Sequence, residues 1–347
     1  MEKSHIFLLT GIMVMMLLAA CGKVNEQTSD NIVRTEASTE NTDASAEERT
    51  EELEDAANSF EWIPYLWNDI YDKAYGSSFH TDFDNYVCAV LNHETEFVCQ
   101  EEKNTWIFLS FANYVCPIVA ELVDDVTYRD GIASIVYSVD EKTADEMIHN
   151  FKQRIEELLN ESIEPGDSDS QKAVLLFYNY VNKLSYDFDA LYSTDNAEWS
   201  VYRGLMDYTG ICQSFAGGYS YLCNQCGIQA TVVYGPSDTR NEYHVWSLVK
   251  IGDNYYYMDP TYNTRENSGL SYFGMTTEER IKQEDYYPEN YNIAFTNTLN
   301  GNDVQVTDTT FQSFWNSTEI TNIIRENGNL NIEYIDTNGV NKTVIVK

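Results

Sequence analysis

Residues 210–216 of this 347-residue chain, Gly-Ile-Cys-Gln-Ser-Phe-Ala, lead into a helical pattern that ends near Gly227. Cys212 is therefore expected at the N-terminus of a helix. Backbone N–H groups and the positive end of the helix dipole favour a thiolate over a thiol there, and the same N–H groups can bind the oxyanion of a tetrahedral intermediate. A single cysteine is more often a small core residue, so Cys212 needs partners to count as a nucleophile.

Two strand-like runs follow this helix, at residues 243–251 and 254–262. Gly252-Asp253, which separates them, is typical of a two-residue hairpin turn. The runs at 243–251 and 254–262 should therefore pair as antiparallel neighbours. A further strand is expected before them, at residues 229–234.

The register of this hairpin decides whether His244 and Asp259 can meet. With the two turn residues at the centre, Trp246 pairs with Asp259 and His244 pairs with Thr261. His244 and Asp259 are then diagonal neighbours on one face, roughly 7 Å apart, which allows an imidazole to hydrogen-bond a carboxylate. A turn centred one residue later would pair Asp259 with Leu248 and separate the two groups.

The three side chains have the chemistry of a nucleophile, a base and a group that orients the base. Residues 210–216, 243–246 (Tyr-His-Val-Trp) and 257–261 (Tyr-Met-Asp-Pro-Thr) resemble the three motifs of the transglutaminase-like superfamily. Segments 200–205 and 271–273 also fit this family. Three ordered motifs make a stronger signal than any one of them.

The resemblance covers residues 168–280 and implies an α+β, papain-like transglutaminase core. In such a fold a helix carries the cysteine, and an antiparallel sheet carries the histidine and the aspartate. The resemblance further implies a catalytic triad of Cys212, His244 and Asp259 and acyl transfer from an amide to water or to an amine. No metal and no organic cofactor are expected.

Two features depart from the family pattern or from ordinary helix composition. Ser214 stands where family members often have glycine, so packing after the cysteine is expected to differ. Gly217 and Gly218 lie inside the predicted helix, where each costs about 1 kcal/mol relative to alanine. They indicate either the close approach of a strand or substrate, or a locally frayed helix.

The composition is strongly acidic, with 56 acidic and 21 basic residues and a net charge of −35. Phosphate backbones are repelled by such a charge, so nucleic acid is not expected as a partner. A hydrophobic content of 43% is enough for one large core or two modest ones.

The N-terminus has the pattern of a secretion signal. Lys3 precedes an apolar run of 15 residues at 6–20, shorter than the about 18 to 20 that span a bilayer. Residues 18–22, Leu-Ala-Ala-Cys-Gly, resemble the bacterial lipobox, which implies that residues 1–20 are removed and that Cys21 becomes a lipid anchor. The protein is then expected on the extracellular face of the bacterial membrane. The alternative is an uncleaved signal anchor.

Residues 21–58 are predicted to form the lipidated cysteine and a disordered acidic tether, with a marginal helix around 46–57, because the stretch has almost no large apolar residue. A small α+β module is expected at residues 59–164. Its predicted strands cover 106–109 and 132–137.

The module is predicted to end in a helix with apolar residues at 3/4 spacing from Met147 to Leu159. Pro165-Gly166 then breaks the chain, and Ser168 to Gln171 has the pattern of a capping box that opens the next helix. These signals place a transglutaminase-like domain at residues 165–290. Residues 291–347 are expected to add β-hairpins with Asn-Gly turns at 300–301, 327–328 and 338–339.

Other candidate sites have weaker signals. Cys223 and Cys226 have a spacing used in zinc and redox sites, but no further ligands complete a set, so buried thiols are favoured over zinc. A disulfide involving one of these or Cys88, Cys99 or Cys116 is open. The acidic pair in Tyr186–Asp189 favours a solvated loop. Three histidines are expected to be ordinary surface or core residues: His80, His93 and His149.

The sequence thus predicts a cell-surface thiol enzyme that hydrolyses amides or transfers acyl groups through a cysteine thioester. Hydrolysis is favoured, because water is abundant and nothing marks an amine-binding site. The expected substrate is a protein or peptide, with peptidoglycan stem peptide as one candidate, and the expected membrane contact is the N-terminal lipid. The alternative is a catalytically silent binding or assembly module.

Overall fold

The computed structural model describes residues 59–193, 196–237, 242–266, 268–296 and 298–347. The predicted signal segment, Cys21, the acidic tether and its marginal helix lie outside the described residues. Within those ranges, no helix combines the length and the apolar character needed to cross a bilayer.

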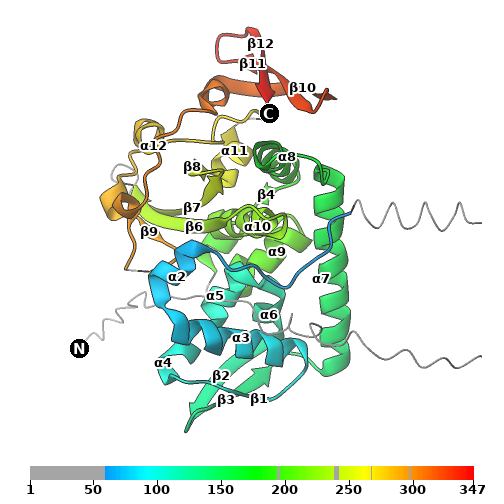
Figure 1. Ribbon diagram of the computed structural model, residues 1–347, viewed down its shortest axis with the longest axis vertical. Coiled ribbons are helices and arrows are strands. Elements are labelled where there is room, and N and C mark those ends of the chain that lie inside the picture. Colours follow the sequence, from blue (N-terminus) through cyan, green and yellow to red (C-terminus); the bar gives the residue numbers. More distant parts are fainter. Residues whose placement is uncertain (1–58, 194–195, 238–241, 267, 297) are drawn as a thin grey trace, which may run out of the picture.

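The chain begins with helices around a small antiparallel sheet whose strand order is β1-β3-β2. Figure 1 shows this sheet at one end of the molecule, with α7 running along one side. The elements are α2 (Asp69–Tyr75), α3 (Ser77–Leu91), β1 (Glu96–Val98), α4 (Glu102–Thr105), α5 (Phe108–Val115), α6 (Pro117–Leu122), β2 (Val123–Arg129), β3 (Ile132–Tyr137) and α7 (Glu141–Ser162).

The strand predicted at residues 132–137 and the helix with its stripe from Met147 to Leu159 are confirmed as β3 and α7. The strand predicted at 106–109 is wrong, because Phe108 opens the helix α5. Its buried side chains follow helical 3/4 spacing, and this longer pattern outweighs the short apolar run. They are Phe108, Phe111, Ala112 and Val115.

The next segment carries the helix of the cysteine motif. The predicted capping box is confirmed, since Ser168 and Gln171 exchange both hydrogen bonds at the start of α8 (Asp169–Val181). Then come β4 (Ser185–Tyr186), η1 (Ala190–Tyr192), η2 (Asn196–Trp199), α9 (Val201–Met206), β5 (Thr209–Gly210) and α10 (Cys212–Gln225). α10 ends just before Gly227, as predicted, and Gly227 has a positive φ of 86°.

The largest sheet of the described residues is four-stranded and antiparallel, with the order β8-β7-β6-β9. Its strands are β6 (Ala230–Ser237), β7 (Glu242–Ile251), β8 (Asn254–Met258) and β9 (Asn292–Ile293). The predicted hairpin register is confirmed, because Ile251 pairs with Asn254 and Ser247 pairs with Met258. The strand predicted to reach residue 262 stops at Met258, since Pro260 starts α11 (Pro260–Glu266).

The C-terminal part contains the helices α12 (Thr277–Glu284), η3 (Pro288–Asn290), η4 (Gly301–Asp303) and η5 (Gln312–Asn316). It ends in a separate antiparallel sheet of β10 (Ser317–Glu326), β11 (Asn329–Asp336) and β12 (Asn341–Val346). The hairpin turns predicted at 327–328 and 338–339 are confirmed. The hairpin turn predicted at 300–301 is wrong, because the Asn300 side chain instead caps η4.

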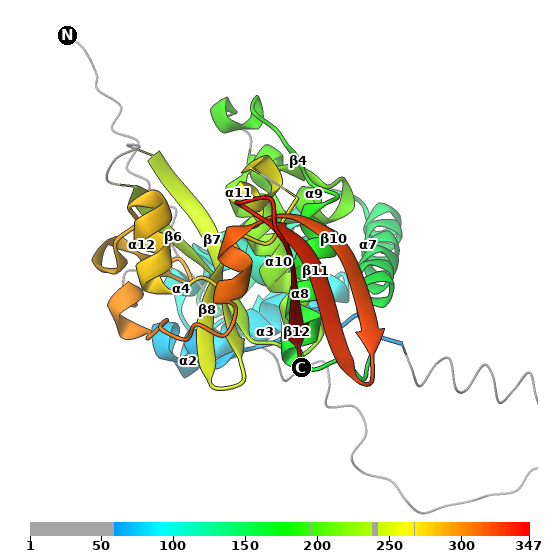
Figure 2. The same cartoon turned by 90° about the horizontal axis from the view of Figure 1, so that it is seen from above.

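α10 lies at the middle of the molecule and contacts β6, β7, α5, α8, α9 and α11 (Figure 2). One continuous cluster of buried apolar residues extends from Tyr65 to Val346 around it. Gly217 and Gly218 permit this contact. A Cβ atom on Gly217 would lie 2.3 Å from Val201 Cγ2, and one on Gly218 would lie 2.2 Å from Tyr180 Oη. The two glycines therefore let α9 and α8 pack closely against α10, so the close approach expected at this point is made by helices and not by a strand or a substrate.

We expect Gly217→Ala to lower the free energy of unfolding by about 1 to 3 kcal/mol, because the added methyl group overlaps Val201. Urea unfolding would measure this. Val201→Ala in the same chain should recover part of the loss. Gly166→Ala is the matched control, since no atom lies within 4 Å of its built Cβ. Equal stability of the two alanine variants would contradict the prediction.

Candidate active site

Cys212 is the first residue of α10, so its backbone N–H and those of the first turn lack partners inside the helix. The chain enters the helix through Gly210, whose φ is +152°. Ser214 is buried, and its hydroxyl accepts a hydrogen bond from the Ile211 N–H at 3.4 Å. A Cβ atom on Gly210 would lie 2.6 Å from Ser214 Oγ. The absence of a side chain at Gly210 therefore leaves room for the buried Ser214 side chain.

The structure brings His244 and Asp259 together. His244 lies on β7 and Asp259 directly follows β8, and Nε2 of the imidazole is 2.7 Å from Oδ2 of the carboxylate. Both residues are buried, with exposed fractions of 5% and 0%. An ionised carboxylate only accepts hydrogen bonds, so Nε2 carries a proton that it donates to Asp259. Nδ1 is then the nitrogen left for another partner.

The Cys212 side chain lies close enough to the imidazole to affect its pKa. Burial by itself lowers the pKa of His244, but the charge of Asp259, the hydrogen bond to Asp259 and hydrogen bonding with Cys212 outweigh burial and raise the pKa to about 9. The thiol, the imidazole and the carboxylate thus form one connected chain of groups. The imidazole at its centre can hold a positive charge at neutral pH.

Asp259 has a second structural role as the residue that precedes α11. Its Oδ1 accepts a hydrogen bond from the backbone N–H of Tyr262 at 3.0 Å, as an N-cap aspartate does. Pro260 suits the first position of this helix because its N–H is not needed there. The Asp-Pro-Thr part of the third motif is therefore a helix start that also directs the carboxylate to His244.

Aromatic rings fix the plane of the imidazole. The His244 ring stacks on Tyr262 with centroids 4.4 Å apart and planes 16° apart. The Tyr262 hydroxyl lies 3.1 Å from the hydroxyl of Tyr286. Stacking and the Asp259 hydrogen bond together leave the imidazole little freedom to rotate.

Arg280 is a site residue that the sequence reasoning missed. This arginine of α12 is fully buried, and its Nη2 lies 2.8 Å from the same Oδ2 of Asp259 that receives His244. The guanidinium lies 4.6 Å from the ring centroid of Trp246 and 4.4 Å from that of Tyr286. Such contacts stabilise a cation away from water.

Arg280 and His244 act together on Asp259. Burial raises the pKa of the Asp259 carboxyl, but the charges of His244 and Arg280 more than offset this and lower it below the ordinary value. Asp259 is therefore held as a carboxylate. In the sequence, Thr277–Glu284 has the composition of an exposed helix, and nothing in it marks one arginine as buried.

The remaining candidates are not part of this group. The thiols of Cys99, Cys116, Cys223 and Cys226 are free and buried. Burial raises the pKa of Cys226 to about 12 and that of Cys223 well above its usual value. In the described ranges, no group of three or more histidine, cysteine and acidic side chains could hold a metal ion.

The histidines outside the triad and the acidic loop have ordinary surroundings. His93 Nε2 lies 2.9 Å from Asp145, and His149 is exposed. His80 packs on the ring of Trp67. In the acidic loop, Asp187 pairs with Arg203 at 2.6 Å.

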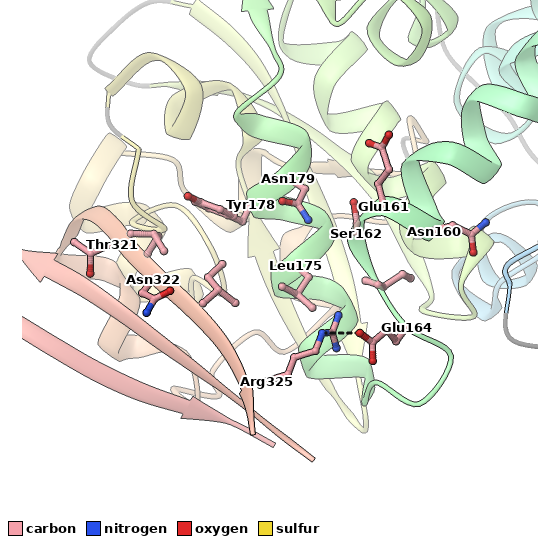
Figure 3. A pocket seen from close by; sticks show the side chains of 13 residues that line it. Asn160, Glu161, Ser162, Glu164, Leu175, Tyr178, Asn179, Thr321, Asn322 and Arg325 are labelled. Carbon is pink, nitrogen blue, oxygen red and sulfur yellow. Dashed lines mark ion pairs between the residues drawn. The ribbon is translucent and has the colours of Figure 1, made fainter. Parts of the chain in front are cut away.

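A cavity of about 440 Å³ lies elsewhere, between α7, α8 and β10 (Figure 3). None of the triad residues lines it. Its charged side chains pair with acids or bases of the same region, as Arg325 does with Glu164 at 3.1 Å and Glu161 does with Lys183 at 2.7 Å. This cavity therefore has no arrangement of groups for acyl chemistry.

Comparison with known proteins finds one matching family. The model of the transglutaminase-like superfamily matches residues 156–260, which include all three triad residues. The fold is a mixed helix and sheet arrangement with a transglutaminase-like core. The match thus covers 105 of the 347 residues of the chain, from 156 to 260. No curated protein matches the chain.

Several solved structures are similar to part of this chain. A crystal structure of a TGase has 17% identity and a TM-score of 0.29 over 40% of this chain and 44% of that chain. A candidate cysteine protease from Cytophaga hutchinsonii has 17% identity and a TM-score of 0.27 over 38% of this chain and 50% of that one. Legionella pneumophila LapG has 17% identity and a TM-score of 0.24 over 35% and 65%. The chain thus spans less than two thirds of each.

The buried His244–Asp259 pair predicts a pH-dependent contribution to stability. A pKa raised from 6.5 to about 9 adds stability that is fully present below pH 6.5 and is lost as the pH rises through about 9. We expect the stability difference between wild type and His244→Gln to fall by about 3 kcal/mol across this range. Urea titrations from pH 6 to 10 would measure it. A difference that does not change with pH would contradict the assignment.

Loss of Arg280 should leave Asp259 with one charged partner. We expect Arg280→Met to lower the free energy of unfolding by about 3 to 5 kcal/mol, because removing one member of a fully buried ion pair leaves the other uncompensated. Arg203→Met is the matched control. Its pair with Asp187 is as short, at 2.6 Å, but partly exposed, and its loss should cost about 1 kcal/mol or less. If urea unfolding shows that Arg280→Met and Arg203→Met lower the free energy of unfolding equally, Arg280 does not stabilise the buried Asp259 carboxylate as argued.

Proposed function

We propose that this protein is a thiol enzyme that cleaves or transfers acyl groups from amides through a thioester on Cys212. One observation carries this proposal: His244 connects the thiol at the start of α10 to a buried carboxylate, Asp259. The match of residues 156–260 to the transglutaminase-like superfamily supports it. In this proposal Cys212 is the nucleophile, His244 the acid and base, and Asp259 the group that orients His244.

The reaction begins with the Cys212 thiolate and the His244 imidazolium. The sulfur attacks the carbonyl carbon and forms a C–S bond, while backbone N–H groups at the start of α10 bind the oxyanion. The C–N bond then breaks, and Nδ1 of His244 gives its proton to the leaving nitrogen. The amine departs, and a thioester and a neutral imidazole remain.

The second half restores the enzyme. Neutral His244 removes a proton from water or from an amine, and that oxygen or nitrogen attacks the thioester carbonyl. The C–S bond breaks, which releases a carboxylic acid or a new amide and returns the thiolate beside an imidazolium. We favour water as the acceptor, because it is abundant and no residue of the site marks an amine-binding position. The enzyme is then a cysteine peptidase-like hydrolase.

We further propose that the enzyme works at the extracellular face of a bacterial membrane, anchored by a lipid on Cys21. The apolar run before Cys21 and its lipobox-like end support this location. The expected substrates are proteins or peptides there, including peptidoglycan stem peptides. The net charge of −35 argues against a nucleic-acid partner.

Iodoacetamide should label Cys212 selectively in the folded protein at pH 7. Cys212 is partly exposed and has His244 beside it, whereas burial raises the pKa of Cys223 and of Cys226. We expect His244→Ala to slow the labelling roughly tenfold or more, because the imidazolium no longer stabilises the thiolate. Peptide mapping by mass spectrometry would measure the rate at each cysteine.

Two serine variants make this test specific. Cys212→Ser should abolish rapid labelling, and Cys223→Ser should leave it intact. If Cys212 reacts no faster than Cys223, or if His244→Ala has no effect, the enzyme proposal is wrong and a catalytically silent binding or assembly module becomes the better description.

A further inference from the structure

Four aromatic rings from separate parts of the chain stack in a row, which we call the aromatic row. It begins with Tyr114 on α5 and Phe295 after β9, whose ring centroids are 4.1 Å apart. Tyr234 on β6 follows at 6.2 Å from Phe295, and Tyr243 on β7 at 5.4 Å from Tyr234. Adjacent ring planes differ by only 17° to 28°. The row therefore forms one continuous surface across three elements and a turn.

The aromatic row starts beside the nucleophile. Tyr114, Tyr234 and Phe295 pack with Cys212 against one small apolar cluster. Burial, and then the charge of the nearby Cys212, raise the pKa of the Tyr114 phenol. At the other end, Tyr243 is 65% exposed and directly precedes His244. The row thus leads from solvent to the thiol.

The position of Phe295 requires an unusual backbone. Ala294 and Phe295 both have a φ of 55°, in the left-handed region that bulky residues rarely adopt. The turn is held by the Tyr75 hydroxyl, which donates to the Ala294 carbonyl at 2.6 Å, and by the Ala294 N–H, which donates to Val232 at 2.9 Å. Backbone strain that the surrounding structure maintains is a feature of functional sites. Here it holds a phenyl ring against Tyr114, at the small apolar cluster that Cys212 also contacts.

We propose that the aromatic row is the substrate-binding surface of this enzyme and that it takes an extended peptide with a large apolar side chain next to the reacting carbonyl. This inference rests on the proposed function and names its substrate class. Sugars bind aromatic residues through open ring faces, but within the row the faces are turned toward one another. What the row offers is apolar ring edges, together with the hydroxyls of Tyr234 and Tyr243.

Those two hydroxyls are suited to a peptide backbone. In the described part of the chain, neither the Tyr234 nor the Tyr243 hydroxyl makes a hydrogen bond with another side chain or the backbone, although each can both donate and accept. A peptide presents both N–H and C=O groups along its length. Apolar edges and hydroxyls on one surface therefore match an apolar side chain and the adjacent backbone.

The test compares two alkylating probes of Cys212 on the full chain: iodoacetamide and N-benzyl iodoacetamide. The measured quantity is the ratio of the benzyl rate to the iodoacetamide rate at Cys212, which reports recognition of an apolar group. We expect Tyr243→Ala and Phe295→Ala each to lower this ratio by about three- to tenfold, as loss of one aromatic contact does. Tyr243 is mostly exposed, so its variant should fold even if Phe295→Ala does not.

Two controls separate recognition from general effects. Tyr243→Phe keeps the ring and should keep most of the ratio. Trp106→Ala removes a 74% exposed ring outside the row and should not change it. If Tyr243→Ala leaves the rate ratio unchanged, or if Trp106→Ala lowers it equally, this inference is wrong. The enzyme proposal would still stand in that case, provided that Cys212 of the wild type reacts faster than the buried cysteines. If Cys212 of the wild type reacts with iodoacetamide no faster than Cys223, both the enzyme proposal and this inference are wrong.

Discussion

The buried carboxylate of Asp259 is the group on which the rest of the site depends. An ionised carboxylate with no exposed surface is costly unless its oxygens are matched by charged or hydrogen-bonding partners. Asp259 has three: the His244 imidazole at 2.7 Å, the Arg280 guanidinium at 2.8 Å and the Tyr262 N–H at 3.0 Å. Each comes from a different element, namely β7, α12 and α11. Their convergence therefore fixes how the hairpin, α11 and α12 pack together.

This arrangement explains why the third motif switches from strand to helix within two residues. If β8 continued to residue 262, Asp259 would be only a diagonal neighbour of His244 across the hairpin, and its second oxygen would lack a backbone donor. Because α11 begins at Pro260, the carboxylate becomes an N-cap and turns toward His244 at hydrogen-bonding distance. The fold thus uses the hairpin to set the position of the aspartate and the helix to set its direction.

Local sequence signals predicted the parts of this site that depend on local rules. The Gly252-Asp253 turn fixed the register that brings His244 and Asp259 to one face, and the pattern after Cys212 correctly placed a helix start there. Arg280 could not be found in this way, because its burial depends on aromatic residues from β7 and from after α12. Asn300-Gly301 shows the same limit. These two residues do mark a change of chain direction, but here they open the helix η4 instead of joining two strands of a hairpin.

Sharing Asp259 between two cations has a chemical consequence. Arg280 remains charged throughout, so Asp259 keeps its own charge whether or not His244 is protonated. In the proposed reaction, the buried carboxylate is still balanced by the guanidinium when His244 gives its proton to a leaving amine. Without Arg280, the same proton transfer would leave an unpaired buried charge, which would hold the proton on His244 more tightly. In the proposed reaction, the second cation therefore lets the imidazole release and regain a proton, while the stacked ring of Tyr262 keeps its plane fixed.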